Sequence, residues 1–282
     1  MSTMKIPFTK MHGAGNDFVL IDATRTPFRA TPELLARLTD RHFGVGCDQV
    51  LVIEPASTPD VDFDYRIYNS DGSEAGQCGN GSRCFARYVH DHGLSNKDVI
   101  RVRTITSVLE LHRLEGGLVR VNMGVPKLEP LDIPFNASPR AERYELRLDN
   151  GTEVEFGVAN MGNPHAVLEV ADVDSAAVEE IGQAIQRNRA FPESVNVGFL
   201  QVHDAGHASL RVYERGAGET LACGTGACGA VVVGRLWGRL SASVDVQVRG
   251  GALKIEWQGE GQPVWMTGPA ETVFSGEIEW PN

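Results

Sequence analysis

The chain has 282 residues, and its 37 Asp and Glu against 26 Lys and Arg give a formal net charge of −11. This acidic balance disfavours a nucleic-acid or anionic-membrane partner, which would call for a basic face. The length favours two domains, since a single domain typically has roughly 100–200 residues, and the absence of a long apolar run predicts a cytoplasmic protein without signal peptide or membrane span.

The first half of the chain is predicted to combine short strands with two helices. Residues 6–22 have the pattern of two strands around a glycine-bearing turn. Thr31-Pro32-Glu33 opens a helix, with Thr31 as N-cap and Pro32 at the first helical position, and we expect it to end near Gly44. The remaining elements expected here are strands at 50–53, 63–68, 99–103, 108–114 and 118–123, and a helix from Cys78 to Gly93.

The second half follows a proline-rich segment, residues 124–140, whose start we take as the domain linker. Asp149-Asn150-Gly151 predicts a hairpin turn between two strands. Further elements are expected at 166–170, 196–202 and 208–213 as strands, at 175–188 and 226–237 as helices, and at 243–279 as three or four strands. The predicted class is α+β, with two pseudo-symmetric domains, each a sheet curled around a central helix.

An internal duplication relates the two halves. YNSDGSEAGQCGNG (68–81) and YERGAGETLACGTG (213–226) share a skeleton without a gap, at an offset of 223 − 78 = 145. The matched pairs are Arg66 and Arg211, Tyr68 and Tyr213, Glu74 and Glu219, Cys78 and Cys223, Gly79 and Gly224, and Gly81 and Gly226. Gly15-Asn16-Asp17-Phe18 and Gly162-Asn163-Pro164-His165 form a second, weaker trace of the duplication.

Two of the five cysteines stand out from the rest. Cys47, Cys84 and Cys228 fit the ordinary role of a small buried apolar side chain. Cys78 and Cys223 instead lie where a polar loop meets a helix start, a position that lowers the pKa of a thiol and leaves backbone N–H groups open to an anion. The spacings C-x5-C and C-x4-C lack the partners of a structural zinc site, so we expect no metal.

Two matched thiols suit the inversion of a carbon stereocentre, in which one group removes a proton and the other returns one from the opposite side. The carbanion that forms beside a carboxylate must be stabilised. Helix N-termini at Gly79 and Asn80, and at Gly224 and Thr225, would supply fixed positive potential to that carboxylate.

The chain resembles the diaminopimelate epimerase family over nearly its whole length. The motifs are MHGAGNDF, Asp48-Gln49, NSDGSEAGQCGNGSRC, MGNPH, VNVGF and ERGAGETLACGTGAC. The resemblance implies conversion of LL-diaminopimelate to the meso form without pyridoxal phosphate or another cofactor. Cys78 and Cys223 would be the two bases, and His165 and Glu214 would assist them. The substrate-binding residues implied are Asn16, Gln49, Asn69, Asn163, Asn196 and Arg215.

The resemblance also implies an assembly and a domain division. A homodimer is expected, although the family's interface tyrosine is matched here by Phe274. The C-terminal strand, 269–282, is expected to pack on the first domain, so that the domains are 1–123 with 269–282, and 124–268.

Two other interpretations stay open on the sequence alone. A racemase of the same fold could act on proline or hydroxyproline, although a monocarboxylate would not use Arg215 and the asparagine cluster. A non-catalytic thiol module could use the cysteines for a redox-sensing disulfide or a metal. The asparagines stand in turns or at strand edges, where Asn is also common for conformational reasons.

Overall fold

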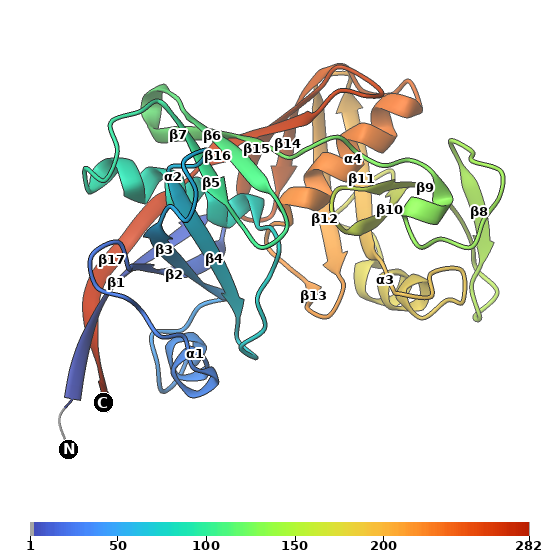
Figure 1. The fold of residues 1–282 in the computed structure, drawn as a ribbon. Coiled ribbons are helices and arrows are strands. Elements are labelled where there is room, and N and C mark those ends of the chain that lie inside the picture. The colour runs from blue at the N-terminus through green and yellow to red at the C-terminus, as the bar shows by residue number, and fades with distance from the viewer. Residues whose placement is uncertain (1–2, 282) are drawn as a thin grey trace. The chain divides into compact units, whose positions relative to one another are not determined.

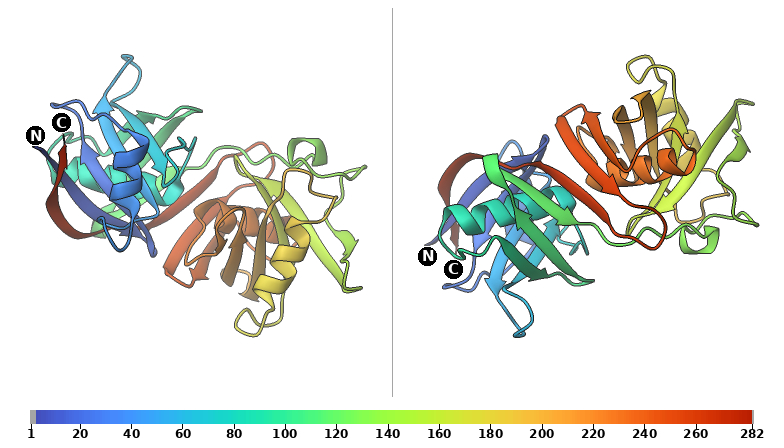
Figure 2. Two further views of the ribbon diagram at one scale, coloured as in Figure 1. Left: turned by 90° about the horizontal axis from the view of Figure 1, so that it is seen from below. Right: turned by 90° about the horizontal axis from the view of Figure 1, so that it is seen from above.

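The computed structural model describes residues 3–281 and divides into two compact units (Figure 1). Unit 1 contains the described residues up to Val121 and those from Gly268 onward, and unit 2 runs from Asn122 to Thr267. In each unit a mixed sheet carries helices on its faces, as the two further views in Figure 2 show. The α+β class predicted from the sequence is confirmed.

The sheet of unit 1 pairs its strands in the order β17-β1-β2-β3-β4-β5-β6-β7. The β2–β3 and β4–β5 pairs are parallel and the other pairs are antiparallel. The strands are β1 (Thr3–Gly13), β2 (Asn16–Asp22), β3 (Gln49–Pro55), β4 (Phe63–Asn69), β5 (Val99–Arg103), β6 (Val108–Arg113), β7 (Leu118–Asn122) and β17 (Glu271–Pro281). The helices are α1 (Pro32–Thr39) and α2 (Gly79–Asp91), with a 3-10 turn η1 (Glu115–Gly117).

Unit 2 repeats this pairing pattern. Its order is β8-β9-β10-β11-β12-β14-β15-β16, again with the third and fifth pairs, β10–β11 and β12–β14, parallel. The strands are β8 (Tyr144–Arg147), β9 (Glu153–Asn160), β10 (Pro164–Glu169), β11 (Asn196–Asp204), β12 (His207–Glu214), β13 (Gly218–Glu219), β14 (Ser243–Val248), β15 (Gly251–Trp257) and β16 (Val264–Pro269). The helices are α3 (Val178–Gln186) and α4 (Gly224–Leu236), with a 3-10 turn η2 (Pro130–Asp132).

The central strands of both sheets are buried on both faces, which explains their continuous apolar runs. In unit 1, Val50 and Val52 pack with Leu34, Leu35 and Leu38 of α1. The alternate residues of β3 point to the other face, where Leu51 lies beside Gly81 of α2.

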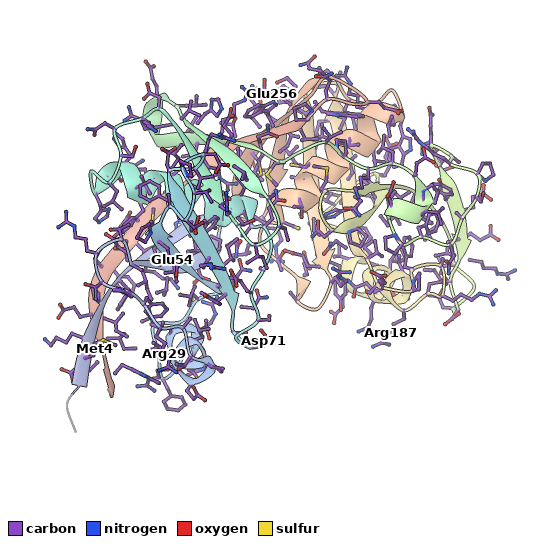
Figure 3. All side chains as sticks on the ribbon, viewed as in Figure 1. Met4, Arg29, Glu54, Asp71, Arg187 and Glu256 are labelled. Carbon is purple, nitrogen blue, oxygen red and sulfur yellow. The ribbon has the colours of Figure 1, made fainter. Side chains whose placement is uncertain are left out.

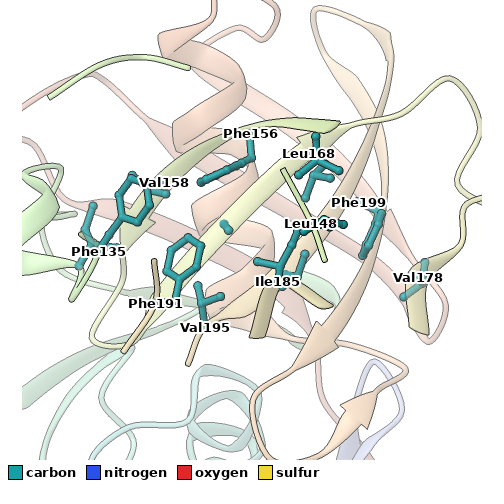
Figure 4. Packing of buried hydrophobic residues seen from close by; sticks show 14 residues of the cluster. Phe135, Leu148, Phe156, Val158, Leu168, Val178, Ile185, Phe191, Val195 and Phe199 are labelled. Carbon is teal, nitrogen blue, oxygen red and sulfur yellow. The ribbon is translucent and has the colours of Figure 1, made fainter. Parts of the chain in front are cut away.

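Unit 2 has the same two-sided arrangement. Phe199 of β11 packs with Val178 and Ile185 of α3, in a cluster that also contains the aromatic rings of Phe156 and Phe191 (Figure 4). α4 covers the opposite face, where Leu200 contacts the helix at Gly234.

The boundaries of the helices differ from the sequence predictions, most of all at the end of α1 and at the start of α3, which begins at Val178 rather than at Ser175. α1 ends at Thr39 rather than near Gly44, because the carboxylate of Asp40 accepts hydrogen bonds from the backbone N–H groups of His42 and Phe43, both at 2.7 Å. These bonds draw the chain into a turn instead of another helical turn. α4 begins at Gly224, two residues before the predicted start at Gly226.

Many polar side chains project from the surfaces of both units. Figure 3 shows Glu54 at the end of β3 and Asp71 at the tip of the loop after β4, both in unit 1, and Arg187 beyond the end of α3 in unit 2. In the part of the chain that the structure describes, no helix has the length and apolar character needed to cross a membrane.

Candidate active site

Cys78 is the N-cap residue of α2. Its backbone is extended, and its sulfur accepts a hydrogen bond from the N–H of Gly81 at 3.3 Å. Gly79 and Asn80 form the first helical positions, so their backbone N–H groups belong to the helix end that carries positive potential. The structure therefore places the thiol at a helix N-terminus, as the sequence predicts.

Asn16 belongs to the same group of side chains, because β2 begins with this residue, after the turn that follows β1. Its side-chain oxygen accepts a hydrogen bond from the amide nitrogen of Asn80 at 3.2 Å and lies 3.9 Å from the sulfur of Cys78. Residues far apart in the sequence thus meet at one end of the sheet of unit 1.

Gln49 and Asn69 lie side by side in the antiparallel pair β3–β4. The Gln49 amide nitrogen donates to the Asn69 side-chain oxygen at 2.8 Å, and the Asn69 amide nitrogen donates to the hydroxyl of Ser73 at 3.0 Å. Since β2 pairs with β3 through Phe18 and Gln49, the two amides lie at the same end of the sheet as Asn16.

Cys223 occupies the equivalent N-cap position of α4, but its environment differs from the prediction. The thiol is buried, with its sulfur 3.5 Å from the hydroxyl of Thr225. Burial, followed by the negative charge of Glu214, raises the pKa of Cys223 well above its ordinary value. The expectation that the helix start lowers this pKa is wrong for the described state, because desolvation of the thiolate outweighs the helix dipole.

Glu214 ends β12, and its carboxylate accepts a hydrogen bond from the hydroxyl of Thr220. Its negative charge contributes to the raised pKa of Cys223. Next to it, the backbone N–H of Arg215 donates to the side-chain oxygen of Asn196 at 3.0 Å, and the guanidinium donates to the carbonyl of Glu193 at 3.0 Å.

His165 is buried against α4, where Gly229 leaves room for its ring. Its Nε2 lies 2.9 Å from the side-chain oxygen of Asn163. Burial and then the charge of Arg215 lower the pKa of His165 to about 3, so the imidazole is neutral near neutral pH. β10 pairs with β11 through His165 and Asn196, which also donates to the Pro164 carbonyl at 2.9 Å.

The repeated Arg and Glu of the duplication form ion pairs, a role that the sequence comparison did not assign. Arg66 contacts Glu74 at 3.1 Å, and Arg211 contacts Glu219 at 2.7 Å. Each pair ties the strand before a cysteine to the loop that leads into it. The two halves therefore share the ion pairs that hold the cysteine loops as well as the thiols themselves.

Two further residues near Cys78 carried no functional prediction. Asp48 accepts a hydrogen bond from the Asn16 amide nitrogen at 2.7 Å, and Tyr65 lies buried under Gly81 of α2. Asp48 follows a glycine-bearing loop and Tyr65 lies in an alternating strand, so local sequence indicated only a loop and a core position. Cys47, Cys84 and Cys228 are buried, as predicted.

Over residues 3–281 the structure brings together no group of three or more His, Cys, Asp or Glu side chains that could hold a metal ion.

Comparison with known proteins identifies close relatives. The family model described as diaminopimelate epimerase matches residues 8–129 and 157–273. A protein named diaminopimelate epimerase from Nitrosospira multiformis is 56% identical over 98% of this chain and 99% of its own length. One of the same name from Azoarcus sp. strain BH72 is 58% identical over 99% of this chain and 100% of its own.

More distant solved structures share the fold. A hydroxyproline epimerase from Agrobacterium vitis aligns with a TM-score of 0.71 at 15% identity, over 98% of this chain and 92% of that one. A PhzF-family phenazine biosynthesis protein from Bacillus anthracis aligns with a TM-score of 0.68 at 17% identity, over 99% of both chains. At such low identity the likeness concerns the fold alone.

Proposed function

The chain belongs to the diaminopimelate epimerase family, and we propose that it interconverts LL-diaminopimelate and meso-diaminopimelate by a two-base mechanism, without a cofactor or metal. As a member of this family it is an isomerase. The proposal assigns it to lysine and peptidoglycan precursor synthesis in the cytoplasm. The observation that carries the mechanism is the occurrence of one cysteine at the N-cap of the equivalent helix in each of two duplicated sheets.

In the proposed reaction, residues 1–123 with 269–282 and residues 124–268 act as two domains that present Cys78 and Cys223 to opposite faces of the α-carbon. One sulfur removes the α-proton as a thiolate, and the other returns a proton as a thiol. The raised pKa of Cys223 favours its protonated form in the described state. The roles exchange in the reverse direction.

The carbanion is the difficult intermediate, because an α-proton is far less acidic than a thiol. The substrate carboxylate beside it would lie against the N-termini of α2 and α4, at Gly79 and Asn80 and at Gly224 and Thr225. Water must be kept out, since it would weaken this electrostatic stabilisation. Glu214, close to Cys223, and His165 are proposed to assist proton transfer at the thiols.

The distal end of the substrate carries an ammonium and a carboxylate that do not react. Arg215 offers its guanidinium to the carboxylate, and the asparagine and glutamine amides offer both donors and acceptors. The proposed binding residues are Asn16, Gln49, Asn69, Asn163, Asn196 and Arg215. Recognition of this end restricts inversion to one stereocentre.

Isotope exchange tests the reaction. The protein incubated with LL-diaminopimelate in deuterated water should give the meso product with deuterium at the inverted carbon, detected by mass spectrometry. Turnover should need a reductant and survive a chelator. Exchange with proline and none with diaminopimelate would assign the protein to a different racemase activity of the same fold.

Substitution of single cysteines tests the mechanism. Cys78→Ser and Cys223→Ser should each lower kcat by roughly 10²–10⁴-fold, the usual contribution of a general acid or base, with little change in melting temperature. The matched control is Cys84→Ala on the same helix as Cys78, which should keep kcat but lower the melting temperature because its side chain is fully buried. A Cys78→Ser enzyme that turns over at the wild-type rate would exclude Cys78 as a base.

A further inference from the structure

A polar cluster holds the loop before β3 against the start of β2. The carboxylate of Asp48 accepts three hydrogen bonds: from the Asn16 amide nitrogen at 2.7 Å, from the Asp17 backbone N–H at 3.2 Å and from the Arg41 guanidinium at 2.8 Å. Asp17 in turn is paired with Arg41 at 2.8 Å and with Lys10 at 2.6 Å. Asp48 is the member of this cluster that contacts the amide of Asn16.

The contact with Asp48 decides which way the Asn16 amide points. A carboxylate has only acceptors, so the NH₂ group of Asn16 must face it. The carbonyl oxygen of the same amide then points the other way, to the Asn80 amide nitrogen at 3.2 Å and the Cys78 sulfur at 3.9 Å. We propose that Asp48 is a positioning residue, which fixes the Asn16 amide so that an acceptor, and not a donor, faces Cys78.

This orientation has two chemical consequences, which rest on the proposed function. An oxygen acceptor beside the thiol favours the S–H form of Cys78, whereas an NH₂ group there would favour the thiolate. The same oxygen can accept from an ammonium group of the substrate, and a reversed amide would present N–H donors to it. Asp48 therefore affects both the readiness of the thiol to ionise and the binding of a cationic group.

The second half of the chain has no such carboxylate. The pairing of β10 with β11 matches His165 to Phe18 and Asn196 to Gln49, an offset of 196 − 49 = 147. The position that corresponds to Asp48 is then Val195, which is buried. There the oxygen of Asn163 lies against the His165 ring. The two equivalent asparagines are thus oriented by different means, an exposed carboxylate in one unit and a buried imidazole in the other.

The exposure of Asp48 distinguishes a positioning role from a role in stabilising the fold. Its side chain is 45% exposed and that of Arg41 is 55% exposed, so their ion pair adds little to the stability of the fold. Removing Arg41 leaves the bond between Asp48 and Asn16 in place. Arg41→Ala is therefore a matched control that disrupts the charged cluster without freeing the amide.

The first test measures catalysis. In Asp48→Asn the new side chain has both a donor and an acceptor, so Asn16 is free to reverse its amide. We expect kcat/KM for LL-diaminopimelate to fall by roughly tenfold, the effect of losing one hydrogen bond to a charged group, mostly through KM. Arg41→Ala should stay within about twofold of wild type, the range of an exposed pair. In the Asn16→Ala background, Asp48→Asn should have no further effect on kcat/KM.

The second test does not depend on activity. The rate of alkylation of Cys78 by iodoacetamide, followed by peptide mapping over a pH series, reports the ionisation of its thiol. The midpoint should move to lower pH in Asp48→Asn, because an N–H donor can then face the sulfur. The same substitution in the Asn16→Ala background measures the direct effect of removing the Asp48 charge, and the shift there should be smaller.

The outcomes are distinguishable. Three results would overturn the positioning role. The first is a midpoint shift that is equal with and without Asn16, and the second is an Asp48→Asn midpoint equal to that of wild type. The third is a loss of kcat/KM in Arg41→Ala as large as that in Asp48→Asn. If the wild-type protein does not turn over diaminopimelate, the proposed function fails, but the alkylation series still decides whether Asp48 acts on Cys78 through Asn16.

Discussion

His165 and Phe18 occupy the same position in the two duplicated sheets, each paired with the first residue of the neighbouring parallel strand. An apolar ring suits this position because it lies between sheet and helix. His165 keeps the shape of a ring but adds nitrogen atoms, and one of them contacts Asn163 at 2.9 Å. Burial holds the imidazole neutral, so it can orient an amide without carrying a charge.

The depressed pKa of His165 predicts a pH-dependent stability. Below about pH 6.5 the unfolded chain binds a proton at this residue, whereas the folded protein resists protonation down to a pKa of about 3. Stability is therefore lost as the pH falls through this window. Between about pH 7 and pH 5 the loss from this group should be about 2 kcal/mol, since one pKa unit corresponds to about 1.4 kcal/mol.

Urea unfolding of wild type and His165→Gln at both pH values measures this contribution. Glutamine can keep a hydrogen bond to Asn163 but does not titrate, so the difference in unfolding free energy between the two proteins should shrink by about 2 kcal/mol at the lower pH. A constant difference between them would mean that the imidazole is protonated as easily in the folded protein as in the unfolded chain.

At the residue scale, the sequence predicts where a side chain lies in the fold better than it predicts the burial and protonation of that side chain. The motif around each cysteine correctly predicts a thiol at a helix start. It does not predict that Cys223 is buried, because that depends on strands and loops brought together by the tertiary fold. Asp48 was missed for a similar reason, since nothing in the local sequence links a loop carboxylate to Asn16, 32 residues earlier.

At the scale of elements, the close seating of α2 on β4 depends on a missing side chain. A Cβ atom at Gly81 would lie 2.5 Å from the hydroxyl oxygen of Tyr65 and 3.3 Å from the methyl groups of Leu51. Tyr65 is fully buried and packs against the tilted ring of Phe85 with ring centroids 4.6 Å apart, so it has no room to move away. Glycine at this position lets the first turn of α2, with Cys78 at its cap, approach the sheet.

The Tyr65 hydroxyl makes this contact without a hydrogen bond among the described residues. Ser82 is near enough to act on the phenol, but its own hydroxyl donates to the carbonyl of Cys78 at 2.8 Å. Burial, followed by the charges of Cys78 and Cys84, raises the pKa of Tyr65 well above its ordinary value, so the phenol stays neutral.

Gly81→Ala should therefore destabilise the protein by about 1–3 kcal/mol, the usual cost of overpacking a core. Tyr65→Phe removes the obstructing oxygen and should recover most of this loss in the double variant, whereas alone it should change stability little because no bonded partner is lost. Chemical denaturation of the four proteins gives the coupling energy. Additive effects would show that the clash lies elsewhere, for example at Leu51.

Most elements could be predicted because their patterns are local. The hydroxyl oxygen of the Thr31 cap accepts a hydrogen bond from the N–H of Leu34 at 3.3 Å, as Thr-Pro-Glu indicates, and the strand at 99–103 has the predicted bounds. The end of α1 was missed because Asp40 forms a turn instead of continuing the helix. The parallel pairing of β2 with β3 depends on contacts across the loop and α1, which periodicity does not reveal.

At the scale of the whole molecule, the duplication extends far beyond the residues that reveal it in the sequence. Only a few positions repeat around each cysteine, yet both sheets have the same succession of antiparallel and parallel pairs. The topology persists because it needs only apolar alternation and turns, whereas the polar loop needs particular residues. Only the family resemblance predicts that the C-terminal strand packs on the first domain. The structure pairs β17 antiparallel with β1, a strand from the opposite end of the chain.

The β17 strand also carries the surface that we propose for homodimer formation. It pairs with β1, and its register shifts between Lys10 and Met11 so that Val273 forms a bulge. Val273 is 54% exposed and Phe274 is 48% exposed, and the Phe274 ring meets Phe8 edge-on at 5.9 Å. Two adjacent apolar side chains on an outer strand favour burial against another chain, and a second copy of this one would bury both.

Phe274→Glu should convert the proposed dimer into a monomer, because a carboxylate buried in the interface would lack a partner. Analytical ultracentrifugation of the variant and wild type measures the change, and circular dichroism verifies that the variant is folded. Leu131→Glu is the control, since Leu131 is an apolar side chain 92% exposed on η2 of unit 2, and it should leave the dimer intact. A wild-type protein that sediments as a monomer, or a Phe274→Glu variant that stays dimeric, would remove β17 from the interface.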